Sequence, residues 1–162
     1  MQTEIYKNRL VVYRNQVQPD WIDYNGHLND AYYVVAFSQG LDGFMESIGL
    51  DAGFREQHQV SMFTLQCMTH YFKEIDEGEA FIITCQLINH DHNKVHLYLQ
   101  MWHNETGEEH AAFEALMLHV DMTTRRAAPW LAETGKKLEA TDTRDQQLPQ
   151  PDKVSASIGI RS

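Results

Sequence analysis

The spacing of the apolar residues determines the fold class of this chain, because it differs between its segments. Between about residues 30 and 48, large apolar side chains recur every three or four positions, as on one face of an α-helix: Tyr33, Phe37, Leu41, Phe44 and Ile48. From residue 59 onward the period falls to two, in runs over about 60–74, 79–89, 94–103 and 109–121. An earlier run over 9–17, rich in valine, also predicts a strand.

This order of elements predicts an α+β domain. The segments between the later strands are short and rich in turn-forming residues, which favours hairpins and an antiparallel sheet. A single amphipathic helix must bury its apolar stripe against one face of that sheet. We therefore expect a five-stranded antiparallel sheet wrapped around one long central helix, the arrangement known as the hotdog fold. The edges of such a sheet need covering, so we expect a homodimer or a higher homo-oligomer.

Glycines and the C-terminal region add detail to this prediction. Gly40 and Gly43 lie inside the predicted helix, where glycine weakens a helix, so we expect the sheet to approach closely there. Gly49 suits the end of the helix. A final short helix is predicted over 129–139. Residues 141–162 have no periodicity, so we expect a domain over 1–140 followed by a loosely ordered C-terminal tail over 141–162.

Composition excludes several classes of partner. A chain of 162 residues is long enough for one domain, and its formal net charge of −10 makes nucleic acid and anionic membranes poor partners. No apolar run reaches the roughly 18 residues that span a membrane, and the first residues do not resemble a signal peptide. Cys67 and Cys85 are eighteen positions apart, which favours buried free thiols in a reducing compartment. We expect a cytoplasmic protein.

The segment over residues 23–29 carries the densest set of chemically useful side chains. Asp23, Asn25 and His27 supply a carboxylate, an amide and an imidazole within five positions, immediately before the predicted helix. The N-terminus of a helix presents unpaired N–H groups and a partial positive charge, and can hold an oxyanion. The same residues could instead form a turn in which Asn29 or Asp30 only caps the helix. The spacing by itself leaves both interpretations open.

The pattern Asp-x-Asn-x-His-x-Asn over residues 23–29, followed by an aromatic-rich helix, resembles the hotdog thioesterase superfamily. Plant acyl-carrier-protein thioesterases share the Asp-x-Asn-x-His core, and this resemblance implies catalytic roles for Asp23, Asn25 and His27. The 4-hydroxybenzoyl-CoA thioesterase group shares Asp-x-x-Gly, which implies that Asp23 is a nucleophile or a general base. In that group the oxyanion site is a helix N-terminus, which here corresponds to Asn29, Asp30 and Ala31.

Residues 20–51 and 114–129, with the strands between them, are also similar to betainyl-CoA thioesterases of carnitine catabolism, some of which are fused to L-carnitine dehydrogenase. This resemblance implies hydrolysis of betainyl-CoA to glycine betaine and CoA. The trimethylammonium group of that substrate needs aromatic faces or a carboxylate. The aromatic candidates are Trp21, Tyr24, Tyr32 and Trp102.

Three further residues are candidates for contacts with the substrate. Several relatives are expected to carry an acidic residue near Gln66, whose amide could orient water or substrate but could not accept a proton. Arg125 and Arg126 form an adjacent basic pair that suits the phosphates of CoA, although a solvated strand end explains the pair slightly better.

Other functions remain as alternatives. A thioesterase for ordinary acyl-CoA or for an acyl carrier protein fits the same residues. A hotdog enoyl-CoA hydratase fits less well, because those enzymes have one more residue between the aspartate and the histidine. A non-catalytic module that binds acyl-CoA without hydrolysing it is a further alternative. We expect no cofactor and no metal, since the histidines at 90, 92 and 96 have no zinc-like pattern of partners and the chain has no phosphate-binding glycine loop.

Overall fold

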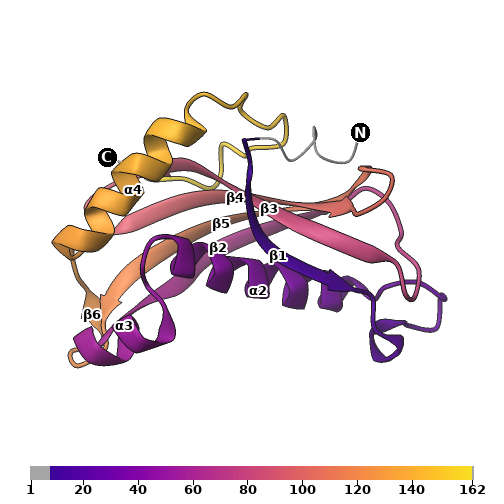
Figure 1. Ribbon diagram of the computed structural model, residues 1–162, viewed down its shortest axis with the longest axis horizontal. Coiled ribbons are helices and arrows are strands. Elements are labelled where there is room, and N and C mark those ends of the chain that lie inside the picture. Colours follow the sequence, from indigo (N-terminus) through magenta and orange to yellow (C-terminus); the bar gives the residue numbers. More distant parts are fainter. Residues whose placement is uncertain (1–7, 162) are drawn as a thin grey trace. The chain divides into compact units, whose positions relative to one another are not determined.

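The computed structural model describes residues 8–161, and Figure 1 shows the order of their elements. The elements in chain order are β1 (Leu10–Gln16), a 3₁₀ turn (Pro19–Trp21), α2 (Asp30–Ser47), α3 (Ala52–His58), β2 (Val60–Tyr71), β3 (Ala80–His90), β4 (Lys94–His103), β5 (Glu109–Asp121), β6 (Arg126–Ala127) and α4 (Ala132–Asp145). The long helix and the five principal strands were all predicted. Helix α3 and the two-residue strand β6 were not. None of the helices in residues 8–161 is long and apolar enough to cross a membrane.

The strands form one antiparallel sheet in the order β1-β3-β4-β5-β2, and β6 pairs with β5. Strand β1 runs antiparallel to β3, from Leu10 opposite Cys85 to Gln16 opposite Ala80 (Figure 1). This path leaves β1 and β2 at its two ends. The sequence-based prediction of an antiparallel α+β sheet with one long helix is therefore confirmed.

The chain divides into two compact units, and the sheet strands contribute to both. Among the described residues, unit 1 contains 8–43 together with 69–85 and 99–113. Unit 2 contains 44–68, 86–98 and 114–161. Each unit has its own buried side chains, and the candidate site described below lies within unit 1.

In unit 1, helix α2 packs closely against the sheet at its two internal glycines, against side chains at Gly40 and against strand backbone at Gly43. A Cβ atom on Gly40 would lie 3.0 Å from Cδ2 of Leu99, and one on Gly43 would lie 2.0 Å from the carbonyl oxygen of Val12. No side chain fits at residue 43 without separating the helix from β1. Phe37, one turn earlier, stacks on Phe113 with ring centroids 5.2 Å apart. The predicted close approach of helix and sheet at these glycines is confirmed.

In unit 2, α2 ends where the sequence predicts, whereas the C-terminal helix is longer than predicted. Gly49 has φ of +84° just after α2 ends, as predicted. Helix α4 begins at Ala132 and continues to Asp145, six residues past the predicted end and past the domain boundary placed at residue 140. It continues because its last residue is anchored: the buried Asp145 carboxylate accepts a hydrogen bond from the Leu87 N–H at 2.8 Å.

The segment after α4 makes specific contacts as well. The Ser155 N–H donates to Oε1 of the buried Glu114 at 2.9 Å, and Oε2 of Glu114 lies 2.6 Å from Nε2 of His96. Ile158 is also buried. The residues predicted as a loosely ordered tail are therefore tied to unit 2 by a buried polar pair that no periodicity reveals.

The two cysteines differ in exposure. Both are free thiols, as predicted, and Cys85 is buried. Cys67 is exposed, so the expectation that both thiols are buried was wrong for Cys67. It lies on β2, which is at one end of the strand order and has only one neighbouring strand to cover it.

Candidate active site

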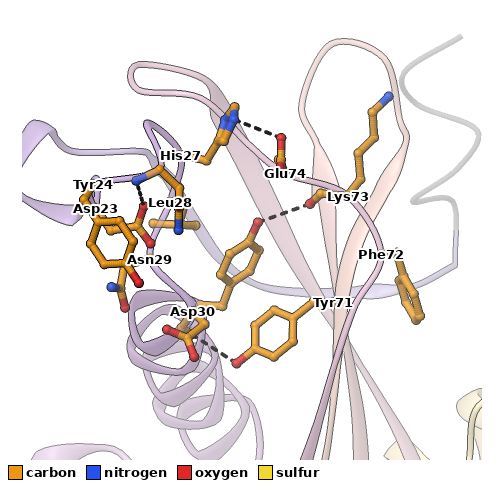
Figure 2. A pocket seen from close by; sticks show the side chains of 12 residues that line it. Asp23, Tyr24, His27, Leu28, Asn29, Asp30, Tyr71, Phe72, Lys73 and Glu74 are labelled. Carbon is orange, nitrogen blue, oxygen red and sulfur yellow. Dashed lines mark hydrogen bonds and ion pairs between the residues drawn. The ribbon is translucent and has the colours of Figure 1, made fainter.

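A cavity of about 750 Å³ lies in unit 1, between the loop before α2 and the end of β2 (Figure 2). The loop, the first turn of α2 and the segment 71–74 provide its walls. The lining residues are Asp23, Tyr24, Asn25, His27, Leu28, Asn29, Asp30, Tyr33, Tyr71, Phe72, Lys73 and Glu74. The three residues predicted to be catalytic, together with Asn29 and Asp30, therefore share one cavity.

The loop holds Asp23 through a compact set of local hydrogen bonds. Oδ1 of Asp23 accepts from the Asn25 N–H at 2.8 Å, and the Asp23 carbonyl accepts from the Gly26 N–H at 3.0 Å. Gly26 adopts φ of +85°, a conformation that side chains disfavour, which explains the Asn-Gly pair at this turn. The Asp23 N–H closes the loop by donating to the His27 carbonyl at 3.1 Å. The position of the Asp23 carboxylate thus depends on both Asn25 and His27.

The start of α2 leaves one amide available to a ligand. Asn29 caps the helix, because its Oδ1 accepts from the Ala31 N–H at 2.9 Å, and its own N–H donates to the Trp21 carbonyl. Within residues 8–161, no acceptor takes the N–H of Asp30, the first residue of the helix. Of the three residues predicted to form the oxyanion site, Asp30 is therefore the one whose amide can serve it.

His27 is held between two carboxylates. Its Nε2 lies 2.9 Å from Oε2 of Glu74, as drawn in Figure 2, and its Nδ1 lies 2.8 Å from Oδ1 of Asp76. Carboxylates only accept hydrogen bonds, so any hydrogen bond between this ring and either carboxylate is donated by a ring nitrogen. The neighbouring Leu28 N–H donates to the Ile75 carbonyl at 3.0 Å. These contacts, which we call the His27 clamp, fasten the Asp23 loop to the segment after β2.

Two tyrosines form the wall that faces the loop. The Tyr33 hydroxyl donates to the Lys73 carbonyl and the Tyr71 hydroxyl donates to the Asp30 carbonyl, each at 3.1 Å. Their rings meet edge to face with centroids 5.2 Å apart. Burial, with a smaller contribution from Glu74, raises the pKa of Tyr33 to about 12. The periodicity of apolar residues places Tyr33 on the buried face of a helix and Tyr71 in a strand, but it does not show that the two rings are in contact.

The sequence matches the family described as "Thioesterase-like superfamily" over residues 17–138. The chain belongs to this superfamily. The thioesterase is similar to a betainyl-CoA thioesterase from Pseudomonas aeruginosa, with 36% identity over 151 residues that cover 93% of this chain and 95% of the relative.

Two further comparisons agree with this assignment. An L-carnitine dehydrogenase/betainyl-CoA thioesterase from a Rhizobium species is 30% identical over 89% of this chain, which corresponds to 29% of that longer protein. A Staphylococcus aureus protein solved in complex with CoA superposes with a TM-score of 0.84 and 25% identity, covering 94% of this chain and 97% of that one. The predicted family, hotdog fold and enzyme class, a thioester hydrolase, are confirmed.

The aromatic residues predicted to bind substrate are mostly occupied elsewhere in the thioesterase. Trp21 and Tyr32 stack on each other with centroids 5.8 Å apart. The Trp102 indole N–H donates to Oγ1 of Thr84 at 2.9 Å, and its ring lies 5.6 Å beneath the Arg9 guanidinium. Of the four aromatic candidates, only Tyr24 lines the cavity.

The remaining candidates belong to unit 2 and do not line the cavity. Gln66 is exposed on β2. Arg125 has φ of +61° in the turn before β6, with its guanidinium 5.6 Å from the Phe63 ring, and Arg126 is exposed in β6. Their predicted roles toward substrate and CoA stay predictions.

The cavity of the thioesterase is acidic. Its lining includes the carboxylates of Asp23, Asp30 and Glu74, of which Glu74 pairs with His27, and the one lysine in the lining is Lys73. The Lys73 ammonium group lies 2.6 Å from Oε1 of Glu108, where its hydrogen bond lowers the pKa of that carboxyl, and Figure 2 shows it turned away from Asp23 and Asp30. This electrostatic environment favours a positively charged acyl group. Within residues 8–161, no cluster of histidine, cysteine and carboxylate side chains has the arrangement of a metal site.

Proposed function

We propose that this thioesterase hydrolyses betainyl-CoA to glycine betaine and CoA. The observation that carries the proposal is the cavity at the start of α2, which combines carboxylates with tyrosine rings and turns its lysine outward. An acyl group with a permanent positive charge suits such a cavity better than a neutral chain does. The two relatives with betainyl-CoA thioesterase in their names support the same substrate.

The proposed mechanism assigns one role to each group around the carbonyl. The thioester oxygen accepts a hydrogen bond from the Asp30 N–H, where the partial positive charge of the helix N-terminus stabilises the oxyanion. Asp23 acts either as the nucleophile or as the base that takes a proton from water. With Asp23 as base, the water oxygen bonds to the carbonyl carbon to give the oxyanion, whose collapse breaks the C–S bond, and the CoA thiolate takes up the proton that Asp23 removed from water. With Asp23 as nucleophile, collapse of the oxyanion expels the CoA thiolate and leaves a mixed anhydride on Asp23, which water then cleaves to glycine betaine and the free carboxylate while the thiolate takes up the released proton. Asn25 holds Asp23 through its N–H, and the His27 clamp fixes the loop.

The proposed function also requires residues that bind the CoA end of the substrate. We assign Arg125 and Arg126 to the phosphates of CoA because both are exposed and guanidinium groups bind phosphates well. CoA binding itself is supported by the similar Staphylococcus aureus protein that was solved with CoA. We also propose a homodimer. Strand β2 lies at one end of the strand order and exposes Phe63 and Leu65, and covering such an edge is a common reason for two copies to pair.

A substrate panel tests the proposed function. Thiol release would be measured for betainyl-, acetyl-, butyryl- and benzoyl-CoA at equal concentrations. We expect the highest kcat/KM with betainyl-CoA. Faster release from the neutral thioesters would refute the betainyl assignment and favour an ordinary acyl-CoA thioesterase. Binding without release from any thioester would instead favour a non-catalytic acyl-CoA-binding module.

A further inference from the structure

The length of the betainyl group limits where its cation can bind. One methylene separates the trimethylammonium nitrogen from the carbonyl carbon, so the two atoms are only about 2.5 Å apart. If the carbonyl oxygen is held by the Asp30 N–H, the cation must lie beside the first turn of α2. This inference rests on the proposed function. The groups that could bind the cation are therefore those that line the cavity next to Asp30.

Tyr71 meets this requirement. Its hydroxyl is fixed to the Asp30 carbonyl at 3.1 Å, and its ring is braced edge-on by the buried Tyr33. The Tyr71 side chain is 48% exposed, so much of its ring remains accessible. Figure 2 shows it beside Asp30, on the wall that faces the Asp23 loop. A rigid aromatic face in this place can hold a quaternary ammonium group, which has no hydrogen-bond donor of its own.

The Asp30 carboxylate supplies the second half of the site. A negative charge beside an oxyanion opposes the reaction of a neutral acyl group, because both charges are negative. A substrate that brings its own cation removes that penalty. We propose that Tyr71 and Asp30 form a subsite for the quaternary ammonium group of the acyl chain, and that Asp30 selects against neutral acyl groups.

Other lining groups are less suited to this role. Tyr24 is 96% exposed at the tip of the loop, and Glu74 is already paired with His27. Phe72 follows Tyr71 in the chain, and Figure 2 shows it on the opposite side of the strand. Tyr71 and Asp30 are therefore the aromatic ring and the carboxylate that adjoin the proposed oxyanion site.

A pair of substrates with the same shape separates charge from size. Betainyl-CoA would be compared with 3,3-dimethylbutanoyl-CoA, in which a carbon atom replaces the quaternary nitrogen. We expect Asp30→Asn to lower kcat/KM for betainyl-CoA by about tenfold and to raise it for the neutral analogue. Tyr71→Leu should lower the preference for betainyl-CoA by about 2- to 30-fold, whereas Tyr71→Phe, which keeps the ring, should keep most of it. Asp42→Asn is the matched control, because it removes the same charge from an exposed position on the same helix.

The outcomes separate the two proposals. Opposite responses of the two substrates to Asp30→Asn would support the subsite. Equal losses for both substrates in the Asp30 and Tyr71 variants would overturn the subsite while leaving betainyl-CoA hydrolysis intact. A wild-type protein that turns over the neutral analogue but not betainyl-CoA would overturn the proposed function and the subsite with it. If Tyr71→Leu does not fold, the conservative Asp30→Asn variant decides the question.

Discussion

Replacing His27 tests whether this residue transfers a proton or holds the loop. Both of its ring nitrogens face carboxylates at 2.8 and 2.9 Å, and the chain closes the Asp23 loop through the His27 carbonyl. A group that is fully occupied by structural partners is poorly placed to exchange protons with substrate. We therefore expect His27 to act as a positioning residue through Asp23. His27→Gln removes the imidazole from the clamp, whereas His27→Arg keeps a side chain with several donors.

The expected magnitudes follow from exposure. The side chains of His27, Glu74 and Asp76 are 35%, 73% and 66% exposed, so solvent screens both ion pairs and each contributes about 0–1 kcal/mol. His27→Gln should lower the free energy of unfolding by roughly 1 kcal/mol, or Tm by about 2–4 °C. Activity should fall by about tenfold, because a small displacement of Asp23 disturbs the attack geometry. Loss of a general acid or base would instead cost about 10²- to 10⁴-fold.

The assay is kcat/KM from thiol release, with thermal unfolding measured on the same samples. Glu74→Gln and Asp76→Asn should each reproduce part of the His27→Gln effect. When Glu74→Gln or Asp76→Asn is combined with His27→Gln, the loss of activity should be smaller than the sum of the two single effects, because the three groups act as one clamp. His27→Arg should recover most of the activity. A loss beyond about 100-fold that Arg does not rescue, with the carboxylate variants near wild type, would refute the clamp and make His27 a catalytic residue.

Two further predictions concern the framework of the site. Gly43→Ala should destabilise the fold by about 3 kcal/mol in urea unfolding, because the new Cβ would lie 2.0 Å from the Val12 carbonyl oxygen; a loss below about 0.5 kcal/mol would contradict the observed packing of α2 on β1. The pKa of Tyr33 is raised to about 12, so the folded state retains a proton that the unfolded chain loses above about pH 10. Stability should therefore fall as the pH rises from about 10 to 12, and Tyr33→Phe should flatten this part of the pH profile; an unchanged slope would show that Tyr33 does not cause it.

Periodicity predicted the framework because burial imposes it. The stripe from Tyr33 to Ile48 is apolar since that face of α2 is buried. In β4 the pleat sends successive side chains to opposite faces, and both faces are buried from Val95 to Met101, so the expectation of a half-buried strand was wrong there. Gly40 and Gly43 marked the contact of helix and sheet because only a missing side chain allows it. The turn around Asp23 and the cap of α2 could also be predicted from the sequence, because both are formed by residues close together in the chain.

The missed features depend on partners that are distant in the chain. His27 and Asp76 are 49 positions apart, and Tyr71 reaches Asp30 across 41. Residue type alone therefore selected Trp21, Tyr32 and Trp102 as cation-binding aromatics, although their rings or indole N–H groups are engaged with other residues. The anchoring of α4 by Asp145 was missed for the same reason, because its partner is a backbone amide in β3.

We propose that Asp23 drives hydrolysis of betainyl-CoA, and the turnover of the Asp23→Asn variant is the first measurement to make. Asparagine keeps an oxygen that can accept from the Asn25 N–H, so the loop should be preserved. Asp20→Asn, an exposed carboxylate in the preceding 3₁₀ turn, is the matched control. We expect a loss of about 100-fold or more in kcat for Asp23→Asn, with unchanged Tm and normal turnover by Asp20→Asn. Wild-type turnover of betainyl-CoA by a folded Asp23→Asn protein would contradict it.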